Sequence, residues 1–152
     1  MDDELPDPGL FKDDLQGRRS HGVVLYVEDD DESRLSITTL LRTSGFEVQE
    51  AATAVSALAL TDSLKNRLDV LIVDYHLGSG STGTEVAETL VRDLGHGVPT
   101  IILTGDPANA EVPWLKNSPL WLIRKPVLPL QLIAGLWPLV AFARAMRRMA
   151  PR

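Results

Sequence analysis

The chain has 152 residues, which is long enough for one domain with a hydrophobic core of its own. Its 21 acidic residues outnumber its 15 lysines and arginines, and the resulting net charge of -6 argues against a nucleic-acid-binding role. It contains no cysteine, which excludes a disulfide framework and a thiolate metal site and is compatible with a cytoplasmic location.

Both ends of the chain differ in composition from its middle. Residues 1–21 contain six acids, three basic residues and two prolines, but no apolar segment of the kind found in signal peptides. This composition predicts a disordered N-terminal arm over 1–21, followed by one domain over 22–145. Residues 146–152 are rich in arginine, and we expect them to form a frayed basic tail.

Between these ends, short apolar runs alternate with segments of helical periodicity. The runs predict buried strands at 23–27, 46–51, 69–74, 99–105 and 120–123. The segments between them predict helices at 31–45, 53–66, 83–95 and from Pro129, with a weaker helix at 106–118 that Pro113 interrupts. Five strands alternating with five helices indicate an α/β fold, in which helices cover both faces of a parallel sheet.

One segment raises the question of a membrane span. Val127 to Ala143 is a stretch of seventeen uncharged residues, which is the lower limit of length for a transmembrane helix. It also contains Pro129 and Pro138, and apolar stretches of this length are more often buried helices. The expected state is therefore a soluble domain.

Polar side chains follow four of the predicted strands, at the point where each strand ends. They are Glu28, Asp29, Asp74, Thr104 and Lys125. In an open parallel sheet the carboxyl ends of the strands share one edge, where ligands bind. Clustered carboxylates repel one another unless a cation compensates them, and a set of hard oxygen ligands suits Mg²⁺. An ionised aspartate is also a nucleophile that needs no general base, and a metal and a lysine would neutralise a phosphoryl group placed on it.

The stretches that carry these residues resemble the receiver domain of bacterial two-component response regulators. They read VLYVEDDDESR, VLIVDYHL, TIILTG and RKP, and the similarity runs from about Val23 to the last helix. The resemblance implies a flavodoxin-like, doubly wound sheet of five parallel strands and five helices. It also implies that Asp74 is the phosphoacceptor and that a histidine kinase or phosphotransfer protein is the partner.

The resemblance assigns a role to each of the other site residues. Glu28 and Asp29 match the acidic pair that holds Mg²⁺ together with Asp74, and the backbone carbonyl of His76 matches a further ligand. Thr104 matches the switch hydroxyl and Lys125 the phosphate-contacting lysine. The residue after that lysine, Pro126, often follows a cis peptide bond in the family.

The implied function is that of a single-domain response regulator that signals through protein contacts, because only 26 residues follow Pro126. Such a protein assists its own phosphorylation and dephosphorylation without being an enzyme in the usual sense. One position departs from the pattern, since Leu122 stands where receivers usually carry the Tyr or Phe of an aromatic switch. The alternative hypothesis is therefore a receiver-like scaffold that is not phosphorylated.

The stretch LGSGSTGTE, residues 77–85, also matches parts of two nucleotide-binding motifs. Its glycines have the G-x-G-x-x-G spacing of dinucleotide-binding folds, and Gly78 and Gly83 have the spacing of a phosphate-binding loop. However, the first glycine follows the third strand at a distance, and no lysine precedes Thr84. We expect these glycines to let the loop turn beside the acidic site. Their spacing resembles that of the same loop in receivers attached to hybrid sensor histidine kinases.

The last helix is more apolar than a helix that covers one sheet face requires. Eight of the thirteen residues from Leu130 to Phe142 are Leu, Ile, Trp, Val or Phe. This excess predicts a second buried face, covered by a dimer partner, a kinase or another domain, and a homodimer would use Leu130, Ile133, Trp137 and Val140. The alternative is that Pro138 kinks the helix, so that both faces pack within one molecule.

Overall fold

In the computed structural model, which describes residues 20–78, 80–111 and 118–149, five strands form one parallel sheet in the order β2-β1-β3-β4-β5. The strands are β1 (Val23–Val27), β2 (Glu47–Ala51), β3 (Val70–Asp74), β4 (Thr100–Thr104) and β5 (Leu120–Arg124). All residues of β1, β3 and β4 are buried, which explains their uninterrupted apolar runs. The predicted doubly wound α/β fold is confirmed.

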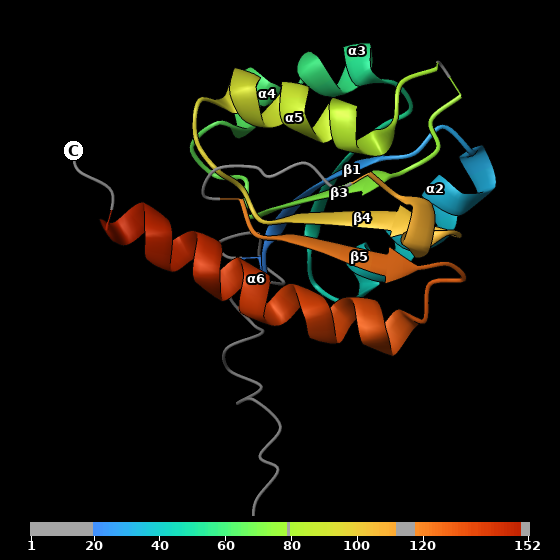
Figure 1. The fold of residues 1–152 in the computed structure, drawn as a ribbon. Coiled ribbons are helices and arrows are strands. Elements are labelled where there is room, and N and C mark those ends of the chain that lie inside the picture. The colour runs from blue at the N-terminus through green and yellow to red at the C-terminus, as the bar shows by residue number, and fades with distance from the viewer. Residues whose placement is uncertain (1–19, 79, 112–117, 150–152) are drawn as a thin grey trace, which may run out of the picture.

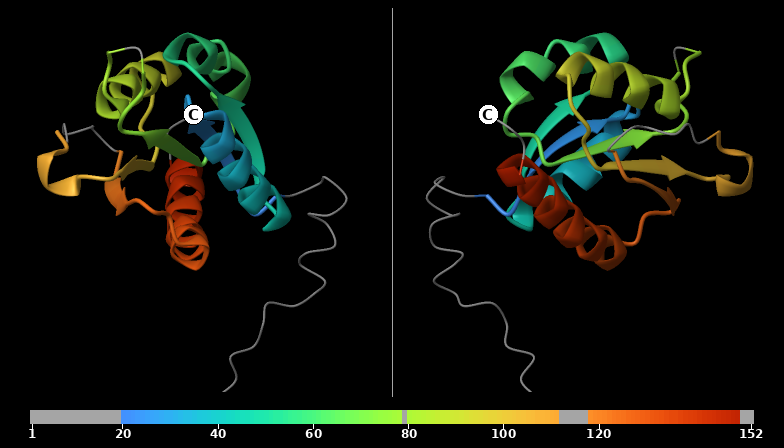
Figure 2. Two further views of the ribbon diagram at one scale, coloured as in Figure 1. Left: turned by 90° about the vertical axis from the view of Figure 1, so that its right-hand side faces the viewer. Right: turned by 60° about the vertical axis from the view of Figure 1, so that its left-hand side comes forward.

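Helices cover both faces of the sheet (Figures 1 and 2). One face carries α3 (Ala54–Leu58), α4 (Thr61–Leu64) and α5 (Gly83–Leu94), and the other carries α2 (Asp31–Thr43) and α6 (Pro129–Met149). Because successive side chains of a strand point to opposite faces, β1 contributes to two cores. Leu25 and Val27 pack on the α5 side, and Val24 and Tyr26 pack on the α6 side.

The start of α2 and that of α5 are fixed by side-chain caps. The Asp30 carboxylate accepts a hydrogen bond from the Ser33 amide at 2.8 Å, and Thr82 caps α5 through the amide of Glu85 at 3.2 Å. Each cap follows a loop at the carboxyl edge of the sheet, so these loops leave the sheet in a defined direction. This edge is the one on which the predicted site lies.

The helix predicted at 53–66 is divided into α3 and α4. The first part begins with a capping box: the Thr53 hydroxyl accepts from the amide of Ser56, and the Ser56 hydroxyl accepts from the amide of Thr53. The hydroxyl of Thr61 donates to the carbonyl of Leu58 at 2.8 Å and thereby competes with the backbone bonds of a continuous helix. Of the helix predicted at 106–118, the structure describes only a short 3₁₀ turn, η1 (Pro107–Asn109), and residues 112–117 lie outside the described part.

Residues at both ends of the predicted domain take part in the fold. Residues 1–19 of the predicted arm lie outside the described residues, but His21 belongs to the fold: its Nδ1 lies 2.9 Å from the carbonyl of Ser44, and its ring contacts Phe46 and Trp137. At the other end, the predicted tail begins as helix, because α6 continues to Met149. Arg147 holds this last turn by pairing with Asp69.

The predicted second face of α6 needs one correction. Val140 is only 4 % exposed and packs in the core on the α6 side, so it is not available to a partner. Ile133 is partly buried against the same core, whereas Leu130 and Trp137 are exposed. By length and apolar composition alone α6 could cross a membrane, but core helices of soluble proteins pass the same test, and Leu132 and Leu136 are fully buried.

Candidate functional site: an acidic pocket with one lysine

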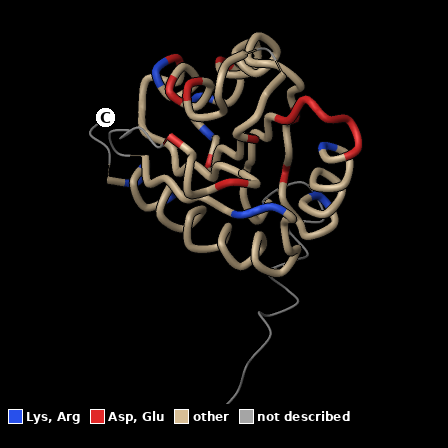
Figure 3. Tube along the Cα trace, turned by 45° about the vertical axis from the view of Figure 1, so that its right-hand side comes forward, with Lys and Arg blue, Asp and Glu red and all other residues tan. Residues whose placement is uncertain are grey.

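The carboxyl edge of the sheet brings the predicted site residues together. Glu28 follows β1, Asp74 ends β3 and Lys125 follows β5, so each comes from a different strand. Figure 3 shows the acids from 28 to 32 as one continuous red segment that runs from the end of β1 into the first turn of α2. Glu28 and Asp74 are buried, and Asp29 is exposed, so the pocket has a buried floor and an acidic rim.

Lys125 compensates two buried carboxylates. Its Nζ makes a close ion pair with Oδ1 of Asp74 and lies 3.7 Å from Oε1 of Glu28. Its amide donates to the carbonyl of Thr104 at 2.9 Å, and the Lys125–Pro126 peptide bond is cis, as the family resemblance implied. The lysine is thus placed by the backbone of β4 and β5 rather than by its side chain alone.

The charges of the pocket shift the pKa values of two groups. Burial, together with the nearby charge of Asp74, raises the pKa of Glu28 from 4.5 to about 7. Burial acts to lower the pKa of Lys125, but the carboxylates of Asp74 and Glu28 outweigh it and raise that pKa above its ordinary value. One ammonium group therefore does not fully compensate the two buried acids.

The donor set fits a divalent cation. Ligand oxygens of Glu28, Asp29 and Asp74 lie within 4.8 Å of one another. Oε2 of Glu28 is buried and has no hydrogen-bond partner among the described residues. A buried oxygen of this kind is costly unless something binds it, and hard oxygen donors are the ligands that Mg²⁺ prefers. Beside these acids, a cavity of about 390 Å³ is lined by Asp29, His76, Gly78 and Thr82, among others.

Two predicted site residues, His76 and Thr104, are positioned by contacts with the backbone. His76 is exposed two residues after Asp74, and it pairs with Thr82 in an isolated antiparallel bridge that shapes the loop. Thr104 is buried at the end of β4, one residue beyond Leu103, which pairs with Asp74. Its hydroxyl accepts a hydrogen bond from the amide of Asp106 at 3.1 Å, and its lone hydrogen remains to donate.

Sequence reasoning missed two features of the pocket. The first is Tyr26, whose buried hydroxyl has no hydrogen bond within the described residues and whose pKa is raised by burial and by the charges of Glu28 and Asp74. The second is the contact made by Gly83. A Cβ there would lie 2.1 Å from the carbonyl oxygen of Asp74, so this glycine is required by close approach rather than by free turning of the loop. Gly80, with φ of 88°, does serve the turn.

The strand next to Lys125 has no aromatic ring at the usual switch position. Leu122 is partly buried against the core on the α5 side, and Trp121 is 47 % exposed. These neighbours pair with Ile102 and Ile101, which belong to the two different cores. Trp121 therefore faces away from the position of Leu122, because successive side chains of a strand point to opposite faces.

Comparison with known proteins agrees with this geometry. The family profile described as response regulator receiver domain matches residues 24–134. The receiver domain of the hybrid histidine kinase CckA is 25% identical with a TM-score of 0.64, and the match covers 78% of this chain and 99% of that one. Vibrio cholerae chemotaxis protein CheY4 is 27% identical with a TM-score of 0.60, covering 78% and 98%.

A receiver domain from Clostridium thermocellum has the same fold, with a TM-score of 0.71 at 24% identity over 82% of this chain and 98% of that one. The two-component response regulator-like protein APRR7 of Arabidopsis thaliana is 37% identical over 51 residues, which span 34% of this chain but only 7% of that protein. The match of the family profile over most of the sheet and its helices decides the classification: the chain belongs to the response regulator receiver domains.

Proposed function

We propose that this receiver accepts a phosphoryl group on Asp74 from the phosphohistidine of a histidine kinase or phosphotransfer protein, in the cytoplasm and with Mg²⁺ as cofactor. The observation that supports this function best is the buried carboxylate of Asp74, which contacts Lys125 and shares a pocket with Glu28 and Asp29. The phosphorylated domain then signals through protein–protein contacts.

The chemistry assigns a distinct role to each group. An oxygen of Asp74 attacks phosphorus, an O–P bond forms, and the N–P bond breaks with its electron pair staying on the imidazole. Lys125 and the hydroxyl of Thr104 stabilise the charge on the transferred oxygens. Mg²⁺, held by Glu28, Asp29, Asp74 and the carbonyl of His76, would supply further neutralisation of that charge. The domain is a phosphoacceptor that assists its own phosphorylation and dephosphorylation.

Labelling with acetyl phosphate tests this function. The wild-type chain should gain the mass of one phosphoryl group in the presence of Mg²⁺, and Asp74→Asn should gain none. Asp31→Asn is the matched control, because Asp31 is 89% exposed and pairs with Arg34 outside the pocket. Labelling of Asp74→Asn at the wild-type rate would show that another residue is the acceptor.

A non-phosphorylated scaffold is the second candidate function, and the leucine at position 122 favours it. With no ring at this position, the usual link between phosphorylation and an aromatic rotamer is missing. A titration with Mg²⁺ at neutral pH separates the two functions. Binding in the millimolar range or tighter supports the phosphoacceptor, and no binding in that range supports the scaffold.

A further inference from the structure

A second and larger cavity lies at the opposite edge of the sheet from Asp74. It has a volume of about 660 Å³ and is formed by the segments that precede β3 and β4 and by the last turns of α6. We call it the basal cavity. Its apolar wall includes Leu68, Phe142, Met146 and Met149, and its cationic groups are Lys65 and Arg147. None of the described residues that line it is acidic.

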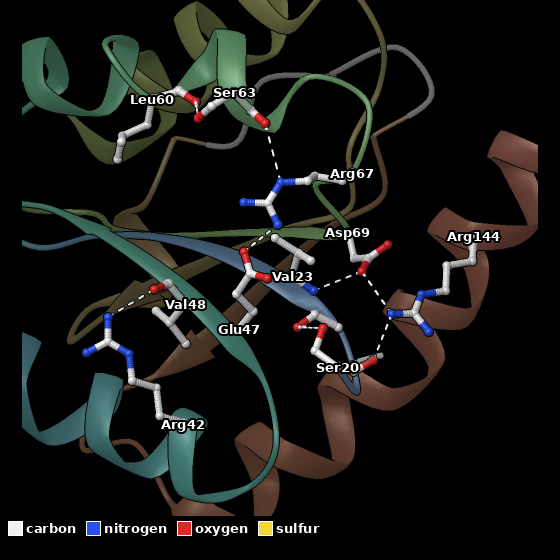
Figure 4. Close-up of polar contacts among 11 residues, drawn as sticks. Ser20, Val23, Arg42, Glu47, Val48, Leu60, Ser63, Arg67, Asp69 and Arg144 are labelled. Atoms are coloured by element: carbon white, nitrogen blue, oxygen red, sulfur yellow. Dashed lines mark hydrogen bonds and ion pairs between the residues drawn. The ribbon is translucent and has the colours of Figure 1, made fainter. Parts of the chain in front are cut away.

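The end of α6 is held firmly beside the basal cavity. Asp69 is 1 % exposed, and its carboxylate accepts from the amide of Val23 at 2.8 Å and pairs with Arg144 and Arg147. Figure 4 shows Val23, Asp69 and Arg144 of this network, together with the bond from Arg144 to the carbonyl of Ser20. Because one carboxylate pairs with two arginines, this network carries one positive charge in excess.

The rim of the basal cavity leaves large apolar side chains open to solvent. Phe142 is 40 % exposed, Met146 is 42 % exposed and Met149 is 79 % exposed. Scattered apolar side chains are common on protein surfaces, but a contiguous set around a cavity of this volume is typical of a binding site. The ligand that suits it is apolar and carries negative charge.

The chain itself contains a segment with these properties. Residues 1–17 hold six acids against one lysine, together with Leu5, Leu10, Phe11 and Leu15. This segment joins the fold at Ser20, whose carbonyl accepts a hydrogen bond from Arg144 at 3.1 Å. Ala143 lines the basal cavity, so the arm is attached at its border. The stretch from Leu15 to Ser20 spans up to about 17 Å when extended, since each residue spans at most about 3.5 Å.

We propose that the segment Leu10–Leu15 of this chain docks in the basal cavity. Phe11 and Leu15 fill its apolar part, and Asp13 and Asp14 face Lys65 and Arg147. The docked segment covers the exposed side chains of the last turns of α6, and it does so on the edge of the sheet opposite the phosphoacceptor. The arm is thus a built-in competitor for any partner that binds this end of α6.

Because the chain has no cysteine, a single engineered pair reports on docking in the full-length protein. Lys12→Cys combined with Met146→Cys should form an intramolecular disulfide about tenfold faster than Lys12→Cys combined with Thr43→Cys, and Phe11 and Leu15 stay intact in both pairs. Thr43 is an exposed residue at the end of α2, and the neighbouring Gly45 accepts a bond from His21 at 3.0 Å. An arm without a preferred site reaches both positions from its root, so this pair is a matched control.

Neutralising the arm tests the electrostatic part. The double substitution Asp13→Asn and Asp14→Asn should remove most of the preference for a disulfide with Met146→Cys. If the Met146→Cys protein does not fold, Met149→Cys takes its place in the same experiment. Equal rates for the two pairs would overturn the proposal. Disulfide-linked dimers at low protein concentration would also overturn it in this form, because they would place the arm of one copy in the cavity of another.

Discussion

The carboxylate of Glu28 offers a sharp test of the acidic pocket, through the variant Glu28→Gln. In the folded protein the pKa of this group is about 7, against 4.5 for an ordinary glutamate. Between these two pH values the unfolded chain releases the proton while the folded chain keeps it. Stability without metal therefore falls as the pH rises, and the difference of about 2.5 pKa units corresponds to about 3 kcal/mol.

The glutamine has the shape of the protonated acid but does not ionise. We therefore expect Glu28→Gln to match the wild type at about pH 4, below the pKa of the unfolded chain, and to exceed its free energy of unfolding by up to about 3 kcal/mol at about pH 8. Urea unfolding in a chelator measures both values. Adding Mg²⁺ at the higher pH should stabilise the wild type and have little effect on the variant, since the variant has lost one of its ligands.

The matched control is Glu32→Gln, which makes the same change at an exposed acid in the first turn of α2. It should alter the free energy of unfolding by less than about 1 kcal/mol at either pH and should keep the response to Mg²⁺. The reasoning fails if Glu28→Gln is no more stable than the wild type at the higher pH. It fails equally if Mg²⁺ stabilises both proteins by the same amount.

Four further substitutions are measured by urea unfolding. Gly83→Ala should cost about 3 kcal/mol, because its Cβ would meet the backbone of Asp74, whereas Gly135→Ala in α6, with no atom within 4 Å of its Cβ, should gain up to about 1 kcal/mol. Asp69→Ala should cost about 1 to 3 kcal/mol, mainly because it leaves the buried amide of Val23 without its acceptor, while Arg144 and Arg147 are partly exposed and keep the carbonyls of Ser20 and Leu68. Tyr26→Phe should raise stability by about 1 kcal/mol, because it removes a buried hydroxyl that makes no hydrogen bond with any described residue; a loss of stability would indicate an ordered water or ion on that hydroxyl.

The sheet was predictable from sequence because its central strands are buried on both faces and so appear as continuous apolar runs. The convergence of Glu28, Asp74 and Lys125 followed from the same fact, since parallel strands end at one edge. Local sequence patterns do not reveal contacts between residues that lie far apart in the chain. The last turn of α6 forms because Arg147 meets Asp69, which is 78 residues away.

Other differences have equally specific causes. The division of the helix at 53–66 depends on one hydroxyl, that of Thr61, which also contacts Asp93 on α5. The burial of Val140 depends on how α6 is rotated against Gly22 and Phe46, and an apolar helix that lacks a clear polar face does not specify this rotation. The role of Gly83 depends on the distance between α5 and β3, which composition does not report.

The central strand β3 has a buried acid at each end, with Asp69 just before it and Asp74 at its last position. The cations that pair with them, Lys125, Arg144 and Arg147, all come from the last fifth of the chain. During synthesis on the ribosome, the middle of the sheet therefore emerges long before its counter-charges. A nascent chain that stops short of Lys125 has to protonate or hydrate both acids, so we expect the sheet to close only after Lys125, Arg144 and Arg147 have been synthesised.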